Sequence, residues 1–522
     1  MGILAKTIVT KQSHIGCFLY FKKGVNVKNL YELIIEIVSE EKLFKILNEK
    51  VNSYNLETKT NVNKAYLLAQ KFHEGQKRKE GTPYITHPLC VAIILAHMKA
   101  DTTMLCAGLL HDVIEDTCCT KDNIIEVFGE SLGEEIYLLV EGVSKFPNEE
   151  YKSMKDLDYA NLRKLMRYID KDARVIIVKL ADRLHNMLTL KYMPSEKQIL
   201  KAEETKEIYV PLANFIGAYY IRDELNDLAF KYLNPNKFLS ITTKLNSLNE
   251  KHDHILKTMT CAISERLQHA EVLYNIKMNF KIIERFKNVS NIYELQRQGK
   301  ELQEINDLIA LKILVNSIGD CYVTLGEIHQ LYKHKKNLIK DHIRDPKTNM
   351  YSAIHTTLFG PCNHLVQARI KTYEMDQNNL RGIIRYYDGN NNKESIQKTL
   401  QENYSFFQTL KDIDEYYGDN QMYVEQLYQE LFMGRIYVYN DMNGDVVDLP
   451  VNSNIIDYLA AIGEDAFRHT SFVLVNNKIV PFNKILRSDD TVRFALHNEI
   501  TNFKYQDIEA SKTIRTRIYS SK

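Results

Sequence analysis

One stretch of the 522-residue chain decides the fold, Leu109 to Thr117, which reads LLHDVIEDT. Apolar residues flank it and no Gly or Pro interrupts it, so the pattern predicts a helix with a buried face. Residues four apart share one face of a helix, which places His111 over Glu115 and Asp112 over Asp116. Because unpaired buried charge is very costly, these groups need a partner, and a divalent cation is the simplest one.

The alternative is an ordinary helix with a solvated acidic end, which an HD dipeptide alone would favour. Two further segments change the balance: Arg78–Pro88, RKEGTPYITHP, and Asp172–Leu190, DARVIIVKLADRLHNMLTL. Nitrogen and carboxylate ligands without a thiolate suit manganese, iron, zinc or magnesium. Together the three stretches supply two His and two Asp residues as candidate ligands, namely His87, His111, Asp112 and Asp182.

The order H…HD…D resembles the HD phosphohydrolase superfamily. The surrounding motifs YITHP, LLHDVIEDT, EGVSKF and VKLADRLHNM resemble the hydrolase domain of the RelA/SpoT family, whose long members make and destroy the guanosine alarmone (p)ppGpp. The resemblance extends from about Val62 to Leu496. It implies a multidomain protein with an all-α HD hydrolase domain, an α/β nucleotidyltransferase-like synthetase domain and a small β-grasp TGS domain.

Composition places the chain among soluble globular proteins. Lys plus Arg, 68, balance Asp plus Glu, 67, so neither a nucleic acid nor a membrane is demanded as a partner. The eight cysteines form no CxxC pair, and we expect reduced thiols in a cytoplasmic protein. We find no apolar run of signal-peptide or membrane-spanning length.

Helical periodicity dominates the first half of the chain, and the β-branched run 175–178 continues into a helix because no breaker follows it. Alternating patterns and strands appear only from about Leu273. We therefore expect an N-terminal helical extension over 1–60, the HD domain over 61–235, the synthetase-like domain over 236–390, a helical linker over 391–433, the TGS-like domain over 434–497 and a tail over 498–522.

In the hydrolase domain, the resemblance implies that the two His and two Asp residues hold the metal, for which we expect Mn²⁺, with another divalent cation as the alternative. It assigns Glu115 and Asp116 to activation of water and proton transfer. The alternative for this pair is surface acids, or groups that orient His111. The helix predicted for this region begins near Asn61.

The resemblance also implies a nucleotide pocket. Arg78 would stack on the base and, with Lys79, meet phosphate; the alternative is a solvated charge cluster. Asn186 and Thr189 match positions that line the pocket. Leu188 departs from the family, which usually has Arg there.

The synthetase-like domain departs from the family at its second carboxylate. The family reads VEVQIRT where this chain reads VQARIKT, so Gln367 replaces the catalytic Glu. An amide is neither a general base nor a carboxylate ligand for Mg²⁺. Asp307 keeps the metal-binding position, Tyr351 matches the guanine-stacking platform, and Met350 replaces a Gly. Further departures in the expected site are Asn291, Leu295 and the segment Ile384 to Tyr387.

We interpret the chain as a metal-dependent (p)ppGpp hydrolase with a degenerate synthetase domain. Two alternatives stay open, a bifunctional enzyme with weak synthesis and a non-catalytic regulator that senses the alarmone. Gln367 argues against the first, and Glu115 and Asp116 with the intact ligand set argue against the second. The TGS-like domain leaves room for a protein partner, and we expect no ribosome or tRNA binding, because the family's usual C-terminal modules are absent.

Overall fold

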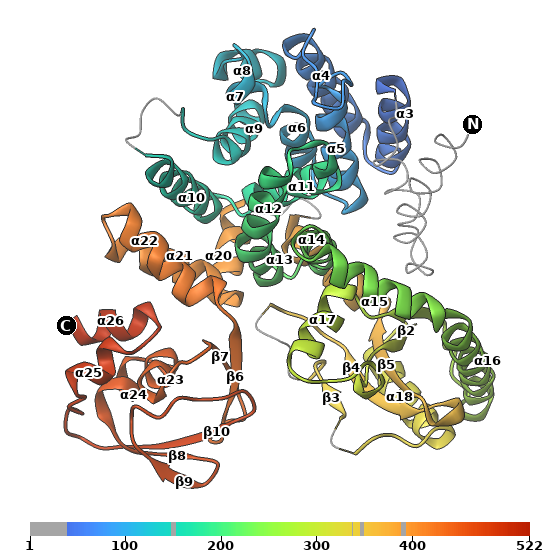
Figure 1. The fold of residues 1–522 in the computed structure, drawn as a ribbon, viewed down its shortest axis with the longest axis vertical. Coiled ribbons are helices and arrows are strands. Elements are labelled where there is room, and N and C mark those ends of the chain that lie inside the picture. The colour runs from blue at the N-terminus through green and yellow to red at the C-terminus, as the bar shows by residue number, and fades with distance from the viewer. Residues whose placement is uncertain (1–38, 148–152, 337, 345–348, 388–392, 522) are drawn as a thin grey trace.

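The structure, a computed structural model, describes residues 39–147, 153–336, 338–344, 349–387 and 393–521 (Figure 1). Figure 1 shows the helices of the N-terminal half at the top, a sheet with its helices at the lower right, and a small second sheet at the lower left. Of the expected N-terminal extension, residues 39–60 are described and contain α3 and the first turn of α4, whereas residues 1–38 lie outside the described residues.

The N-terminal half is helical, as predicted. Helices α5 and α6 are apolar on every side and almost fully buried, so they form the centre of this part. Helix α11 includes the β-branched run 175–178, as expected. The helices are α3 (Glu40–Val51), α4 (Leu56–Phe72), α5 (Thr86–His97), α6 (Thr102–Leu110), α7 (Val113–Asp116), α8 (Lys121–Phe128), α9 (Glu130–Val143), α10 (Met154–Lys171), α11 (Arg174–Leu188), α12 (Ser195–Glu204), a π-helical turn (Thr205–Tyr209), α13 (Val210–Phe215) and α14 (Tyr219–Leu233).

Two of the expected helix limits are wrong. The helix expected over Leu109–Thr117 is broken, because α6 ends before His111 and α7 begins after Asp112. The physical reason is that the His111 Nδ1–H donates to the carbonyl of Gly108 at 2.9 Å, which ends the helix by a side-chain bond. Helix α4 begins at Leu56 rather than near Asn61, because the Asn55 side chain accepts the Thr58 N–H and caps it.

The second part contains a five-stranded mixed sheet in the order β1-β2-β5-β4-β3. Strands β2 and β5 are parallel and the other pairs are antiparallel. Strand β2 is buried along nearly its whole length, as expected for a strand covered on both faces. The elements are α15 (Pro235–Ser247), α16 (Asn249–Tyr274), β1 (Lys281–Phe286), α17 (Val289–Arg297), β2 (Ile309–Val315), α18 (Ile318–Leu331), β3 (Lys340–Asp341), β4 (Ile354–Phe359), β5 (Leu365–Thr372) and α19 (Tyr373–Arg381).

A helical linker leads to a second five-stranded sheet, of order β7-β6-β10-β8-β9. Its first two strands form an antiparallel hairpin, and Gly444 takes the positive φ of 80° that the connecting turn requires. The elements are α20 (Lys393–Asn403), α21 (Ser405–Tyr416), α22 (Asn420–Leu427), β6 (Arg435–Asn440), β7 (Val446–Pro450), α23 (Ile455–Ile462), α24 (Glu464–His469), β8 (Thr470–Val475), β9 (Lys478–Val480), β10 (Thr491–Leu496), α25 (Tyr505–Glu509) and α26 (Ile514–Ser521).

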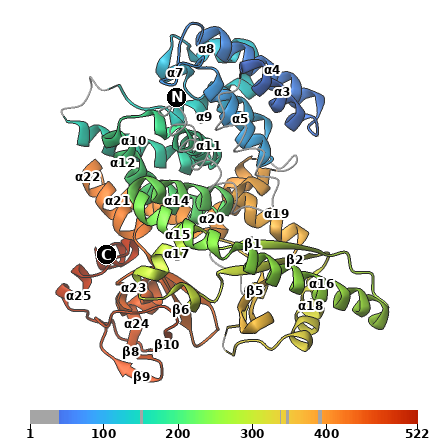
Figure 2. The same cartoon turned by 45° about the vertical axis from the view of Figure 1, so that its right-hand side comes forward.

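The end of α19 joins the sheet to the helical half, and Figure 2 shows this helix beside α5. The Arg381 guanidinium donates to the carbonyls of Met98 at 2.9 Å and Lys99 at 3.0 Å, just beyond α5. Gly382 follows with φ 58°, and a Cβ there would lie 2.1 Å from the carbonyl oxygen of Ile216. Only glycine therefore permits this close approach.

The linker is held to α10 by Arg163. Its guanidinium donates to the carbonyls of Tyr417 at 2.6 Å and Gly418 at 2.7 Å, and to the Asp414 carboxylate at 2.9 Å. The Arg163 side chain is 6% exposed, whereas Arg167, which binds the same Asp414, is 52% exposed. The two arginines thus make a matched pair, one buried and one solvated.

We predict that Arg163→Met lowers the free energy of opening of α21 and α22 by about 3 kcal/mol, because it leaves buried acceptors without a donor. Arg167→Met should cost at most about 1 kcal/mol, because its ion pair is solvated. Amide hydrogen exchange of the two helices measures both effects. Equal protection in the two variants would contradict the prediction.

Candidate functional site

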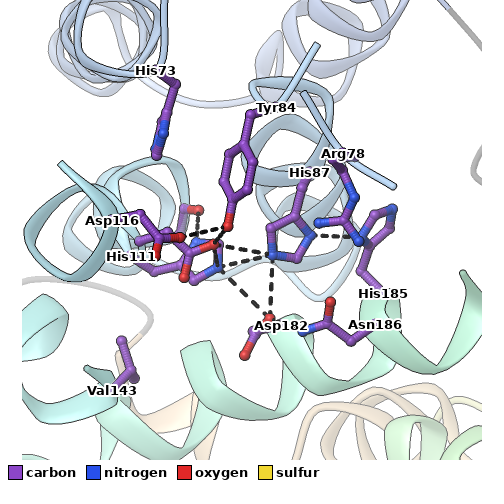
Figure 3. Close-up of polar contacts among 12 residues, drawn as sticks. His73, Arg78, Tyr84, His87, His111, Asp116, Val143, Asp182, His185 and Asn186 are labelled. Atoms are coloured by element: carbon purple, nitrogen blue, oxygen red, sulfur yellow. Dashed lines mark hydrogen bonds and ion pairs between the residues drawn. The ribbon is translucent and has the colours of Figure 1, made fainter. Parts of the chain in front are cut away.

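The four predicted ligand residues come together, and Figure 3 shows His87, His111 and Asp182 facing one another. His87 lies in the first turn of α5, His111 and Asp112 lie between α6 and α7, and Asp182 lies in α11. His87 Nε2 and His111 Nε2 are 3.1 Å apart. Asp112 Oδ2 is 3.2 Å from His111 Nε2, and Asp182 Oδ1 is 3.3 Å from His87 Nε2. Two nitrogens and two carboxylate oxygens therefore face a common point, a donor set that fits a divalent cation.

The outward nitrogens of the two imidazoles fix which lone pairs face this point. His111 donates its Nδ1–H to Gly108, so in the neutral imidazole the lone pair lies on Nε2, which faces the other ligand atoms. His87 Nδ1 lies 2.6 Å from His185 Nδ1, so one of these nitrogens donates to the other. Burial, reinforced by His87 and Arg78, holds the pKa of His185 well below its usual value, so His185 is neutral. With His87 as the donor, both Nε2 lone pairs face the centre.

Asp182 is oriented by its own helix. Asn186 donates to Asp182 Oδ1 at 2.5 Å, and Lys179 Nζ lies 3.4 Å from Oδ2 while donating to the carbonyl of Val143 at 3.0 Å. Burial alone would raise the pKa of Asp182, but Lys179 and the two histidines outweigh burial and hold it well below the usual value. Lys179 and His185 are not among the residues predicted for this site. Their spacing of three residues on either side of Asp182 was the signal, because such residues share a helix face.

The cluster attracts positive charge. Burial disfavours the charged form of His111, but Asp112 and Asp182 outweigh burial and raise its pKa to about 10. Burial would raise the pKa of Asp112, but His111 and His87 outweigh burial and hold it below its usual range. Without a metal ion, the cluster therefore holds a proton where a cation would sit.

The two predicted acid–base residues are exposed beside this centre. Asp116 Oδ2 lies 2.8 Å from the hydroxyl of Tyr84, which also lies 2.7 Å from Asp112 Oδ2. Glu115 accepts the backbone N–H of Lys145 at 3.0 Å. Because the helix is broken at the HD pair, the expected stacking of Glu115 on His111 is not found among the contacts of the described residues.

Three of the four predicted nucleotide residues surround one side of the centre. Arg78 donates to the Thr189 hydroxyl at 3.3 Å, and Asn186 binds Asp182 as described above. Lys79 is exposed on the loop beside Arg78. Leu188 is 6% exposed within the hydrophobic core, which shows that its side chain is used for packing.

The mixed sheet, α14 and α17 form a second site, a cavity of about 370 Å³ lined by four cationic side chains and two acidic ones. Asp307 lies in it, 2.5 Å from Lys287 Nζ and 3.5 Å from Arg369 Nη2. Arg369 also donates its Nε–H to Gln367 Oε1 at 2.6 Å. Asp307 and Gln367 stand at the two positions where carboxylates are expected, and each is thus paired with a cationic side chain of the protein itself. Other lining residues are Arg222, Arg285, Asn291 and Leu295.

Tyr351 lies beside this cavity with its ring facing other aromatic groups. Its hydroxyl is 2.8 Å from His355 Nε2, and the ring of Tyr219 meets it edge-on at 5.2 Å. Met350 takes a φ of 61°, the left-handed conformation that suits the Gly expected there.

The expectation that Ile384 to Tyr387 lies in the synthetase site is wrong. Ile384 is fully buried in the helical core, and the Arg174 guanidinium lies 5.4 Å from the ring of Tyr387. This segment connects the sheet to the helical half. Its apolar residues therefore reflect packing between the two parts.

Three family models match the chain: the HD domain over 65–219, the region found in RelA / SpoT proteins over 284–391, and the TGS domain over 436–495. The chain belongs to the RelA/SpoT family. This confirms the resemblance and the fold class of all three domains, an all-α HD domain, an α/β synthetase-like domain and a TGS domain.

Relatives in the family cover most of this chain. A GTP pyrophosphokinase of Myxococcus xanthus is 36% identical over 83% of this chain and 56% of its own length. The bifunctional (p)ppGpp synthase/hydrolase SpoT of Escherichia coli K12 is 34% identical over 86% of this chain and 63% of its own. GTP pyrophosphokinase rsh of Brucella melitensis is 35% identical over 83% and 57%. The chain thus spans about three fifths of the length of these RelA/SpoT relatives.

A divalent metal agrees with the HD family and with the cluster of His87, His111 and Asp182, whereas its identity as Mn²⁺ stays a prediction. The described cysteines are all free, and Cys17 lies outside the described residues. Among the described helices, none has the length and hydropathy needed to cross a bilayer.

We predict that metal binding releases about one proton at pH 7 to 8, because His111, with its pKa raised to about 10, must lose a proton to act as a ligand. Below that pKa, the apparent Kd for Mn²⁺ should fall about tenfold for each unit by which the pH rises. Titration calorimetry in two buffers of different ionisation enthalpy counts the protons. A Kd that does not change with pH would contradict this.

Proposed function

We propose that the chain hydrolyses (p)ppGpp at the HD centre, releasing pyrophosphate and leaving GDP or GTP. The observation that carries the proposal is the convergence of the His87, His111, Asp112 and Asp182 donor atoms beside two exposed acids. The Escherichia coli K12 relative, named a synthase/hydrolase, supports the substrate class.

The four ligand residues would hold a divalent cation, for which we propose Mn²⁺. When bound, it supplies an acidified water and neutralises phosphate charge. Glu115 and Asp116 are exposed carboxylates that accept the proton of the attacking water and return one to the leaving oxygen. The Lys145 N–H keeps Glu115 at the edge of the centre.

The nucleotide would lie along the side formed by the loop before α5 and the end of α11. Arg78 offers a planar guanidinium to the base and phosphate, and Lys79 adds a second charge. Thr189 holds Arg78 in place at 3.3 Å, and Asn186 lies one turn earlier in α11. These roles extend the family resemblance to this chain.

Synthesis of (p)ppGpp by the second site is the other candidate activity. The names of the relatives favour it, since the Escherichia coli K12 protein is called bifunctional and the other two are called pyrophosphokinases. Gln367 and the pairing of Asp307 with Lys287 and Arg369 favour its loss. In the bifunctional candidate and in the hydrolase-only candidate alike, the HD centre is a hydrolase.

Cellular context belongs to the same proposal. A cytoplasmic enzyme agrees with a soluble alarmone substrate, and the TGS domain, matched over 436–495, offers a surface for a protein partner. A non-catalytic regulator would not need an assembled set of metal ligands with two acids beside it, so we place the regulator hypothesis last.

We predict that purified protein converts ppGpp to GDP and pyrophosphate with Mn²⁺ and that chelation abolishes turnover. Asp182→Ala should abolish turnover as well, because it removes one of the four atoms that would bind the metal. Asp158→Ala, an exposed acid on α10, serves as the control and should keep full activity. Nucleotides resolved by ion-exchange chromatography give the result, and full activity of Asp182→Ala would remove the metal assignment.

The second site is tested with ATP and GDP. We predict no ppGpp synthesis by the unmodified chain, because Gln367 takes no proton from the 3′-hydroxyl. Gln367→Glu alone should not restore synthesis, because Asn291 and Leu295 also line the cavity. Robust synthesis by the unmodified chain would establish the bifunctional candidate instead.

A further inference from the structure

Tyr84 lies between the candidate metal centre and the exposed acid Asp116 (Figure 3). Its hydroxyl is 2.7 Å from Asp112 Oδ2 and 2.8 Å from Asp116 Oδ2. The same Asp112 oxygen is 3.2 Å from His111 Nε2 and belongs to the predicted ligand set. One phenol thus connects a ligand atom with the carboxylate to which we assign proton transfer.

The position of Tyr84 is set by contacts other than these carboxylates. Its ring stacks on the imidazole of His73, with centroids 4.6 Å apart and planes inclined by 25°. His73 Nδ1 is 2.8 Å from Gln76 Oε1, and the Tyr84 N–H donates to the Gln76 carbonyl at 3.0 Å. Gln76 Nε2 donates to the Asp116 carbonyl at 3.1 Å. The loop therefore presents the hydroxyl at a defined place relative to α7.

His73 itself indicates that this arrangement serves more than stability. It is 3% exposed, and its Nε2 is buried with no hydrogen-bond partner among the described residues. An unpaired buried polar atom costs about 1 to 3 kcal/mol. An apolar ring would stack on Tyr84 without that cost, but it would not bind Gln76.

We propose that Tyr84 is a positioning residue that holds Asp116 at the metal centre and shares Asp112 Oδ2 with the cation. The inference rests on the proposed hydrolysis and adds a residue that the ligand set does not include. A phenol has one proton and donates it to one acceptor at a time. A cation on Asp112 Oδ2 competes for that oxygen's lone pairs, so the O–H turns to Asp116.

The Asp116 carboxylate depends on the Tyr84 hydroxyl for its orientation. Its side chain is exposed, and the Tyr84 hydroxyl is the hydrogen-bond partner found for its carboxylate among the described residues. Without that bond the carboxylate samples several rotamers in water. A proton-transfer group must lie within hydrogen-bond reach of its target, so loss of orientation lowers kcat more than it changes substrate binding.

Tyr84→Phe is the direct test, because it keeps the ring on His73 and removes only the hydroxyl. The matched control is Tyr66→Phe. Tyr66 lies in α4, and its hydroxyl donates to Glu40 Oε1 at 2.6 Å, a phenol-to-carboxylate bond of the same kind. We expect Tyr84→Phe to lower kcat by about 10- to 100-fold, with KM changed by less than about threefold. The Mn²⁺ Kd should fall by up to about tenfold, because the hydroxyl no longer competes with the cation for Asp112 Oδ2. Tyr66→Phe should change none of these.

A double-mutant cycle separates positioning from a general structural role. If Tyr84 acts through Asp116, adding Tyr84→Phe to Asp116→Asn lowers kcat by no more than about twofold. A full additional loss in the double variant would overturn the proposal, as would a Tyr84→Phe protein with the kcat and Mn²⁺ Kd of the unmodified chain.

The Mn²⁺ Kd, measured by electron paramagnetic resonance of the free ion, does not depend on the substrate. If the unmodified chain fails to hydrolyse ppGpp, the proposed function fails. In that case a lowered Kd in Tyr84→Phe but not in Tyr66→Phe still supports the link to Asp112, and equal Kd values overturn it.

Discussion

The burial of two carboxylates and two imidazoles between α5, α6 and α11 is the constraint on which the helical half depends. Such a cluster is costly in an apolar interior unless each group has a partner. The partners come from the surrounding elements: Lys179 and Asn186 for Asp182, Gly108 for His111, and Tyr84 for Asp112. A divalent cation would complete this compensation, because it would satisfy all four inward-facing atoms at once.

The break between α6 and α7 places the ligands. In a continuous helix, His111 and Asp112 would point about 100° apart around the axis. Here α6 ends at Leu110, and Asp112 has a φ of −100°, so that His111 Nε2 and Asp112 Oδ2 approach to 3.2 Å. The same break brings Asp116 under Tyr84 and Glu115 to the Lys145 backbone. A local irregularity of two residues therefore assembles both the ligand set and the acids beside it.

The second site illustrates how a carboxylate is neutralised when its partner is missing. Asp307 would share a metal with a second carboxylate in an active synthetase of the family. In this chain Gln367 accepts a hydrogen bond from Arg369, and Asp307 binds Lys287, so the cavity presents mainly cationic groups. Cations of this kind attract anions such as polyphosphates. The cavity also includes Arg222 of α14, a helix that packs on α11, so the two sites are connected through adjacent helices.

The sequence by itself determined the family, the fold class and the residues that meet at the centre. Sequence motifs specific enough to be recognised without a structure contain His87, His111, Asp112 and Asp182. Helical periodicity also predicted α11 through its β-branched run, because long apolar patterns without breakers outweigh local propensity. The tertiary structure alone decided where the helix at the HD pair breaks, that Ile384 belongs to the helical core, and that Tyr84, Lys179 and His185 surround the ligands. These features depend on contacts between residues far apart in sequence, such as Tyr84 with Asp112, and periodicity within one segment carries no information about them.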